Sequence, residues 1–113
     1  MRLEEVVASV DASTIYASDG WENTHIGSVV ASDMISDILV GEGEDQLLVT
    51  SLTSTQMVRT AGLIGTSAIL LVNRRQVPPA LEEAARSEGI PVFLSGRSKY
   101  EVCVRIGQLE ADG

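Results

Sequence analysis

The feature that most constrains the fold of this chain is a set of three short apolar runs, Leu47–Val49, Ala68–Val72 and Ile90–Leu94. Each run is bounded by turn residues, as expected for a strand that is buried on both faces of a sheet. The runs alternate with two segments of helical pattern, each of roughly 10–15 residues. Strands that alternate with helices of this kind form βαβ units, so the sequence predicts a parallel arrangement of these three strands.

The part of the sequence that precedes these runs contains weaker signals. Leucine and valine at helical spacing predict a helix over Arg2–Ser9. Thr14–Ala17 and His25–Ala31 are β-like, and the sequence leaves open whether they join the main sheet. A second helix is predicted after Ser32 or Asp33, either of which is a good N-cap. Its expected apolar stripe consists of Met34, Ile35, Ile38 and Leu39.

Capping signals mark three later helices. Thr53–Gln56 and Ser98–Glu101 both have the spacing of a capping box, and Pro78–Pro79 suits the first turn of a helix. Glycines at positions 65 and 89 are typical helix stops. We therefore expect residues 1–113 to form a single α/β domain, with a largely parallel or mixed sheet of about 4–5 strands and flanking helices.

The charge of the chain excludes some classes of partner. The 16 acidic and 8 basic residues give a net charge of -8, which argues against nucleic acid and against an anionic membrane surface. The acidic stretch Gly41–Asp45 is interpreted as a solvated turn. No basic-then-apolar leader opens the sequence, and no apolar run approaches the ~18 residues of a membrane span, so we expect a cytoplasmic protein.

Polar residues follow each of the three predicted core strands. Because the carboxyl ends of parallel strands meet at one edge of a sheet, these residues are expected to lie together. Free N–H groups at helix starts, with a guanidinium nearby, can bind an anion, so we expect a nucleotide or another phosphate-bearing small molecule as the ligand. Ordinary helix caps and turns account for the same residues. The candidate binding residues are Ser32, Asp33, Ser51, Thr53, Asn73, Arg74 and Ser95.

Catalysis has weaker support in the sequence. His25 is the only histidine, and no serine, cysteine or acid stands at a spacing that would make it part of a catalytic set. Cys103, the only cysteine, lies beside the apolar face of the last predicted helix and is interpreted as a core residue. The sequence contains no phosphate-binding glycine loop and no metal-ligand cluster. We therefore expect no catalytic residues, no metal and no resident cofactor.

Two segments resemble the DRTGG-domain family. Ala31-Ser-Asp-Met-Ile-Ser-Asp37 resembles a Ser-Asp repeat of that family, and the Gly89-Ile-Pro-Val92 turn follows it in the right order. The resemblance covers about Leu3 to Leu109. The family is similar to the N-terminal domain of HPr kinase/phosphorylase, and it also occurs beside CBS domains in regulated pyrophosphatases. The resemblance implies a small regulatory α/β domain, often at a dimer interface, and here a stand-alone copy.

The sequence departs from the family after the second core strand. Many relatives have Thr-Gly-Gly where this chain has Asn73-Arg74-Arg75, and the loss of two glycines removes a close backbone approach to a ligand. The first hypothesis is a non-catalytic regulatory or ligand-sensing domain that forms a homodimer. The alternative is an interaction or scaffold module that docks to a larger enzyme without a small-molecule ligand. A small phosphotransfer enzyme is the third.

Overall fold

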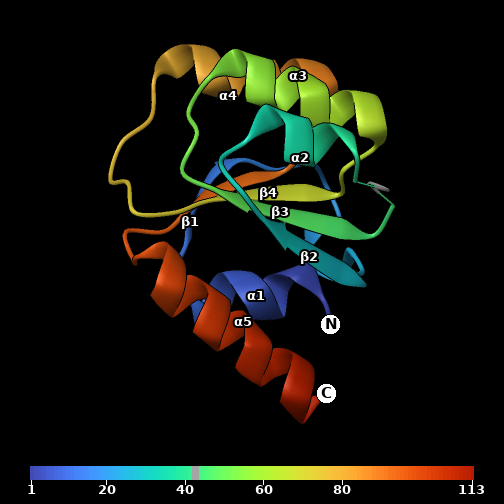
Figure 1. The fold of residues 1–113 in the computed structure, drawn as a ribbon, viewed down its shortest axis with the longest axis vertical. Helices are drawn as coiled ribbons and strands as arrows, with labels where there is room; N and C mark the ends of the chain where they lie inside the picture. Colours follow the sequence, from blue (N-terminus) through green and yellow to red (C-terminus); the bar gives the residue numbers. More distant parts are fainter. Residues whose placement is uncertain (42–43) are drawn as a thin grey trace.

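The structure, a computed structural model, describes residues 1–41 and 44–113, and these residues form a layered α/β fold (Figure 1). Within them, five strands form one mixed sheet in the order β1-β5-β4-β3-β2. Strands β2 to β5 are parallel, and β1 pairs with β5 in the antiparallel direction. The α/β prediction with a mixed sheet is therefore confirmed. The strands are β1 (Ser13–Tyr16), β2 (Ser28–Ala31), β3 (Gln46–Thr50), β4 (Ala68–Leu71) and β5 (Val92–Leu94).

The helices cover both faces of the sheet. Figure 1 shows α2, α3 and α4 on one face, and α1 and α5 on the other. Among the described residues, no helix combines the length and the apolar character needed to cross a membrane. The helices are α1 (Leu3–Ser9), α2 (Ile35–Leu39), α3 (Thr55–Ile64), α4 (Pro79–Glu88), α5 (Lys99–Asp112) and the short 3-10 helix η1 (Trp21–Asn23).

The three predicted core strands separate two apolar cores. Successive side chains of a strand point to opposite faces, so each strand contributes to both. In β4, Leu70 packs with α1 and α5, whereas Ile69 and Leu71 pack beneath α2, α3 and α4. Phe93 of β5 is fully buried in the first core, where its ring lies 4.7 Å from that of Trp21. Every residue of β3, β4 and β5 is buried, as their apolar runs predict.

The two β-like runs near the start of the chain form the edges of the sheet. Strand β2 pairs with β3, with Val29 opposite Leu47, and β1 pairs with β5, with Ser13 opposite Leu94. The register of β1 shifts between Thr14 and Tyr16, as at a β-bulge. Bulges of this kind bend an edge strand and discourage further pairing.

The structure corrects the sequence-based boundaries at two helices. The cap of α3 is Ser54 and not Thr53, because the Ser54 hydroxyl accepts a hydrogen bond from Met57 N. Helix α2 begins at Ile35, and only Ile38 of its predicted apolar stripe is buried. The cap at Ser98 and the stops at glycines 65 and 89 are as predicted. The acidic turn predicted at Gly41–Asp45 includes residues 42 and 43, which lie outside the described residues.

A pair of glycine substitutions tests the helix stops. Gly89 ends α4 with φ 70°, a left-handed conformation, so Gly89→Ala should lower the free energy of unfolding by about 1–2 kcal/mol. Gly107 lies inside α5, where a Cβ would meet nothing within 4 Å, so Gly107→Ala should raise it by about 0.5–1 kcal/mol. Urea denaturation of both variants checks the opposite signs. Equal shifts would contradict this account of the two positions.

Candidate functional site

The carboxyl ends of β3, β4 and β5 continue into loops that are joined by backbone hydrogen bonds. Val72 N donates to Thr50 O at 3.0 Å, and Asn73 N donates to Arg97 O at 2.8 Å. Ser95 N donates to the carbonyl at the end of β4, Leu71 O, at 2.8 Å. We call this edge, made of residues 32–34, 50–54, 73–78 and 95–99, the carboxyl rim. The structure therefore brings Ser51, Asn73 and Ser95 to one edge of the sheet.

Asp33 is the one acidic residue of the carboxyl rim, and both of its carboxylate oxygens accept hydrogen bonds. Its Oδ1 accepts from Thr50 Oγ1 at 3.0 Å and from Ser51 N at 2.8 Å. Its Oδ2 accepts from Ser51 Oγ at 2.8 Å and forms an ion pair with Lys99 Nζ. Four donors from the end of β3 and the start of α5 therefore converge on one carboxylate, which is only half-exposed.

These donors determine the charge of Asp33. Partial burial alone would raise the pKa of the carboxyl group, because burial disfavours the charged form. The hydrogen bonds from Lys99, Ser51 and Thr50 together outweigh burial and hold the pKa of Asp33 well below its usual range. Asp33 is therefore ionised throughout the physiological pH range.

Ser32 and Thr53 are at the carboxyl rim but contribute differently. The Ser32 hydroxyl accepts from Met34 N at 3.1 Å and donates to Asp37 Oδ2 at 2.8 Å, so it shapes the turn into α2. The side chain of Thr53 takes part in none of the hydrogen bonds found among the described residues. It is half-buried in the loop between β3 and α3.

Two exposed arginines follow β4. Asn73 adopts φ 58°, a left-handed conformation that asparagine tolerates better than most residues. This turn directs Arg74 along the carboxyl rim, where its Nε donates to Ser51 O at 3.4 Å. Within residues 1–41 and 44–113, neither Arg74 nor Arg75 forms an ion pair. Both guanidinium groups therefore keep donors that a ligand could use.

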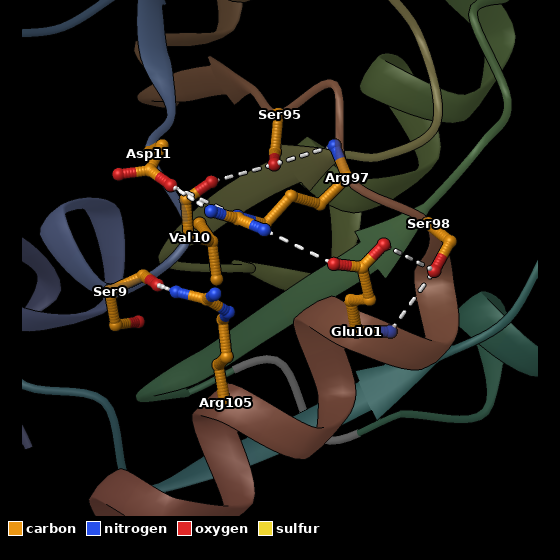
Figure 2. A network of polar contacts seen from close by, with 8 residues as sticks. All are labelled: Ser9, Val10, Asp11, Ser95, Arg97, Ser98, Glu101 and Arg105. Atoms are coloured by element: carbon orange, nitrogen blue, oxygen red, sulfur yellow. Dashed lines mark hydrogen bonds and ion pairs between the residues drawn. The ribbon is translucent and has the colours of Figure 1, made fainter.

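Ser95 has a structural position, which the sequence did not indicate. It is fully buried, and its hydroxyl donates to Val10 O at 2.8 Å and accepts from Arg97 N at 3.2 Å. Figure 2 shows these two bonds at the centre of a polar network. A ligand at the carboxyl rim cannot reach the Ser95 hydroxyl without breaking these two hydrogen bonds. Ser95 therefore stabilises the loop that follows β5 and does not face a ligand.

The same network engages Arg97. Its guanidinium forms ion pairs with Asp11 and Glu101, the latter at 3.1 Å (Figure 2). The hydrogen bonds and charge of Arg97 lower the pKa of both carboxyl groups, and the hydrogen bonds that Arg97 donates to Asp11 raise the pKa of Arg97. In the same view Arg105 donates to Ser9 O at 2.9 Å. Arg97 and Arg105 thus fasten the end of α1 to α5.

The candidate binding residues predicted from the sequence do not include Lys99 and Thr50. Lys99 is the first residue of α5, and its position directly after the predicted cap Ser98 placed it at the same edge as the other candidates. Thr50 is the last residue of β3 and is fully buried. Both residues could have been predicted at this edge, because Thr50 ends a parallel strand and Lys99 begins the helix that follows the last strand.

A surface hollow adjoins Arg75. It has a volume of about 450 Å³ and lies between β1, the end of β5 and the loop that leads into α4. Its lining includes Arg75 together with the apolar side chains Ile15, Val77 and Leu94. A larger hollow of about 470 Å³ lies at the amino end of β2, beside Met1 and His25. Among the described residues, no group of three or more His, Cys, Asp or Glu side chains is placed to hold a metal ion.

The lowered pKa of Asp33 gives a stability prediction. Asp33→Asn should reduce the free energy of unfolding at neutral pH by about 1–2 kcal/mol, because it weakens charge-assisted bonds at a half-exposed position. A carboxyl with a lowered pKa stabilises the fold above its unfolded pKa of about 3.9, and this contribution is lost as the pH falls toward the folded pKa. The difference between variant and wild type should therefore be constant from about pH 7 to about pH 5 and shrink below about pH 4.

Urea denaturation at each pH measures this difference. Asp19→Asn is the matched control, since Asp19 is exposed and makes no side-chain hydrogen bond or ion pair with other described residues. A difference for Asp33→Asn that grows on acidification would contradict the assignment.

Comparison with known proteins shows a similarity of fold to a solved structure and no match in sequence. No protein-family model and no curated protein sequence matches this chain. A solved structure of the CBS and DRTGG domains of the regulatory region of Clostridium perfringens pyrophosphatase, complexed with the activator diadenosine tetraphosphate, matches with a TM-score of 0.77 at 12% sequence identity. The match covers 93% of this chain and 45% of that chain. The chain therefore has a fold of the kind found in this CBS and DRTGG region.

Proposed function

We propose that this protein is a non-catalytic, ligand-sensing regulatory domain of the DRTGG type, which binds a nucleotide or another phosphorylated small molecule at the carboxyl rim. The observation that carries the proposal is the position of Arg74 and Arg75, two exposed cations without ion-pair partners among the described residues. They project at the edge where α3 and α5 also begin. Helix starts and guanidinium groups together favour phosphate.

The hollow beside Arg75 fits the remainder of such a ligand. Ile15, Val77 and Leu94 offer apolar surface for a base or another flat group, while the guanidinium at the edge of the hollow faces the charged end. The phosphate chain would then run from Arg75 past Arg74 toward Ser51. In this arrangement the apolar part of the ligand lies in the hollow and its anionic part lies beside it, along the carboxyl rim.

The structural neighbour supports a regulatory role. It is the regulatory region of an enzyme and was solved with a nucleotide activator, diadenosine tetraphosphate. The shared fold is compatible with a regulatory domain that is not itself catalytic. At 12% identity the choice of ligand does not transfer between the two proteins, so our proposal for the ligand depends on the arginines and the hollow.

A substitution at Arg74 tests the site. A ligand at 100 times its dissociation constant should stabilise the protein by about 2.7 kcal/mol, which thermal unfolding with a panel of nucleotides detects. Arg74→Ala should abolish most of that stabilisation, because it removes a charged donor. Arg59→Ala, which removes an exposed arginine of α3, should leave it intact. Equal stabilisation of both variants would place the ligand elsewhere, and no stabilisation by any nucleotide or phosphorylated metabolite would contradict ligand sensing.

A second candidate function is interaction with another protein, including a second copy of this chain. Large apolar side chains are exposed in and beside α2 and at the end of α3, and α2 connects the edge strand β2 to β3. Strand β2 carries no charged residue or proline, which are the usual protection of an exposed edge. The exposed apolar residues here are Met34, Leu39, Val40 and Leu63.

We propose a homodimer that uses this surface, with docking to a larger enzyme as the alternative occupant. Light scattering should give the mass of a dimer for the wild type, and Val40→Glu should shift the equilibrium toward the monomer, because Val40 is 83% exposed. Ser36→Glu, on the same helix, adds the same charge at an exposed polar position and is the control. A monomer at millimolar concentration would remove the dimer from the proposal.

A further inference from the structure

Four donors at the carboxyl rim are already occupied by an anionic side chain of the protein itself, the carboxylate of Asp33. The carboxylate of Asp33 accepts hydrogen bonds from Thr50 Oγ1, Ser51 N and Ser51 Oγ, and it pairs with Lys99. This donor set combines one backbone N–H, two hydroxyl groups and one ammonium group. The same combination suits a phosphoryl group, whose oxygens accept the same kinds of hydrogen bond.

We propose that Asp33 is an internal competitor, which occupies the place where a phosphoryl group of the ligand binds, so that binding requires Asp33 to leave. This inference rests on the proposed function. It implies that only a ligand with enough negative charge displaces Asp33 from the site. Two or more linked phosphates, as in pyrophosphate or a nucleoside triphosphate, have the charge and reach to replace a single carboxylate.

The exchange is balanced in hydrogen bonds. The oxygens of a phosphoryl group can accept from the buried Thr50 hydroxyl, from Ser51 and from Lys99, so no donor of the set is left without a partner. The phosphoryl group also carries more negative charge than a carboxylate, and Arg74, whose Nε lies 3.4 Å from Ser51 O, is close enough to add to its binding. Asp33 is half-exposed and can return to water when displaced.

Displacement of Asp33 would also destabilise α2. The hydrogen bonds that Asp33 accepts from Thr50 and Ser51 hold residues 32–34 against the end of β3, and α2 begins directly after them at Ile35. Helix α2 has only 5 residues, of which Ile38 alone is buried, so few contacts hold it once these bonds are broken. Release of Asp33 would therefore loosen the helix that exposes Met34, Leu39 and Val40, and would couple the ligand to the proposed interaction surface.

Isothermal titration calorimetry with pyrophosphate and with ATP tests the inference. Asp33→Asn should bind both at least about tenfold more tightly than wild type, because the fraction of molecules with an open site rises. Asp37→Asn is the matched control, since it removes an equal charge from the same region, and it should change the affinity by less than about twofold. Tighter binding of both probes would show recognition of the phosphate chain. A gain with ATP and none with pyrophosphate would overturn the inference, because removal of the competing carboxylate should favour the phosphate chain that both probes carry.

The outcomes separate the two proposals. If wild type binds ATP through Arg74 and Asp33→Asn binds no more tightly, the internal competitor is wrong and the proposed function stands. If neither protein binds pyrophosphate or ATP at millimolar concentration, the internal competitor is wrong, and the panel of nucleotides and phosphorylated metabolites decides the proposed function. Loss of the gain in the double variant Asp33→Asn with Arg74→Ala would support both. Hydrogen exchange in the wild type is independent of variant folding: ATP should accelerate exchange in residues 34–40, and unchanged exchange in the bound state would overturn the inference.

Discussion

Burial of β3, β4 and β5 on both faces is the constraint on which the rest of the structure depends. Each of these strands has one row of side chains in each core, so neither layer of helices can be removed without exposing apolar surface to water. Strict alternation also fixes the register, because a shift of one residue would exchange the two rows. Leu70 and Ile69 illustrate this, since adjacent residues of β4 belong to different cores.

A fixed register has a direct effect on the carboxyl rim. Because Thr50 pairs with Leu71, and Leu71 with Leu94, the three strands end within one residue of each other. The polar residues that follow are therefore brought together by the packing of apolar residues several positions earlier. The geometry of Asp33, Ser51 and Lys99 therefore follows from the packing of the core.

The sequence allowed prediction of the part of the fold that is local. The runs at Leu47–Val49 and Ala68–Val72, with helices between, were sufficient for the βαβ units. It did not allow prediction of the partner of β1, because a short β-like run carries no information on which strand it joins. At the candidate site, the sequence placed Ser51 and Arg74 at one edge, where the structure has them, and their role in binding remains a prediction. It did not indicate that Ser95 is buried, because the hydrogen bond from its hydroxyl to Val10 O is a property of the assembled fold. The pairing of Asp33 with Lys99, 66 residues away, had no local signal.

The place of β1 in the sheet also has a consequence for how the chain folds. Ser13 lies opposite Leu94, and the carbonyl of Val10 receives the hydroxyl of a residue 85 positions later. Strand β1 therefore has no partner strand until β5, near the end of the sequence, has been made. Contacts at such separations carry a large loop-closure entropy, so they form late and slowly. On the ribosome, β1 must therefore remain unpaired until β5 emerges, whereas Leu3 of α1 already has a backbone partner in Thr24.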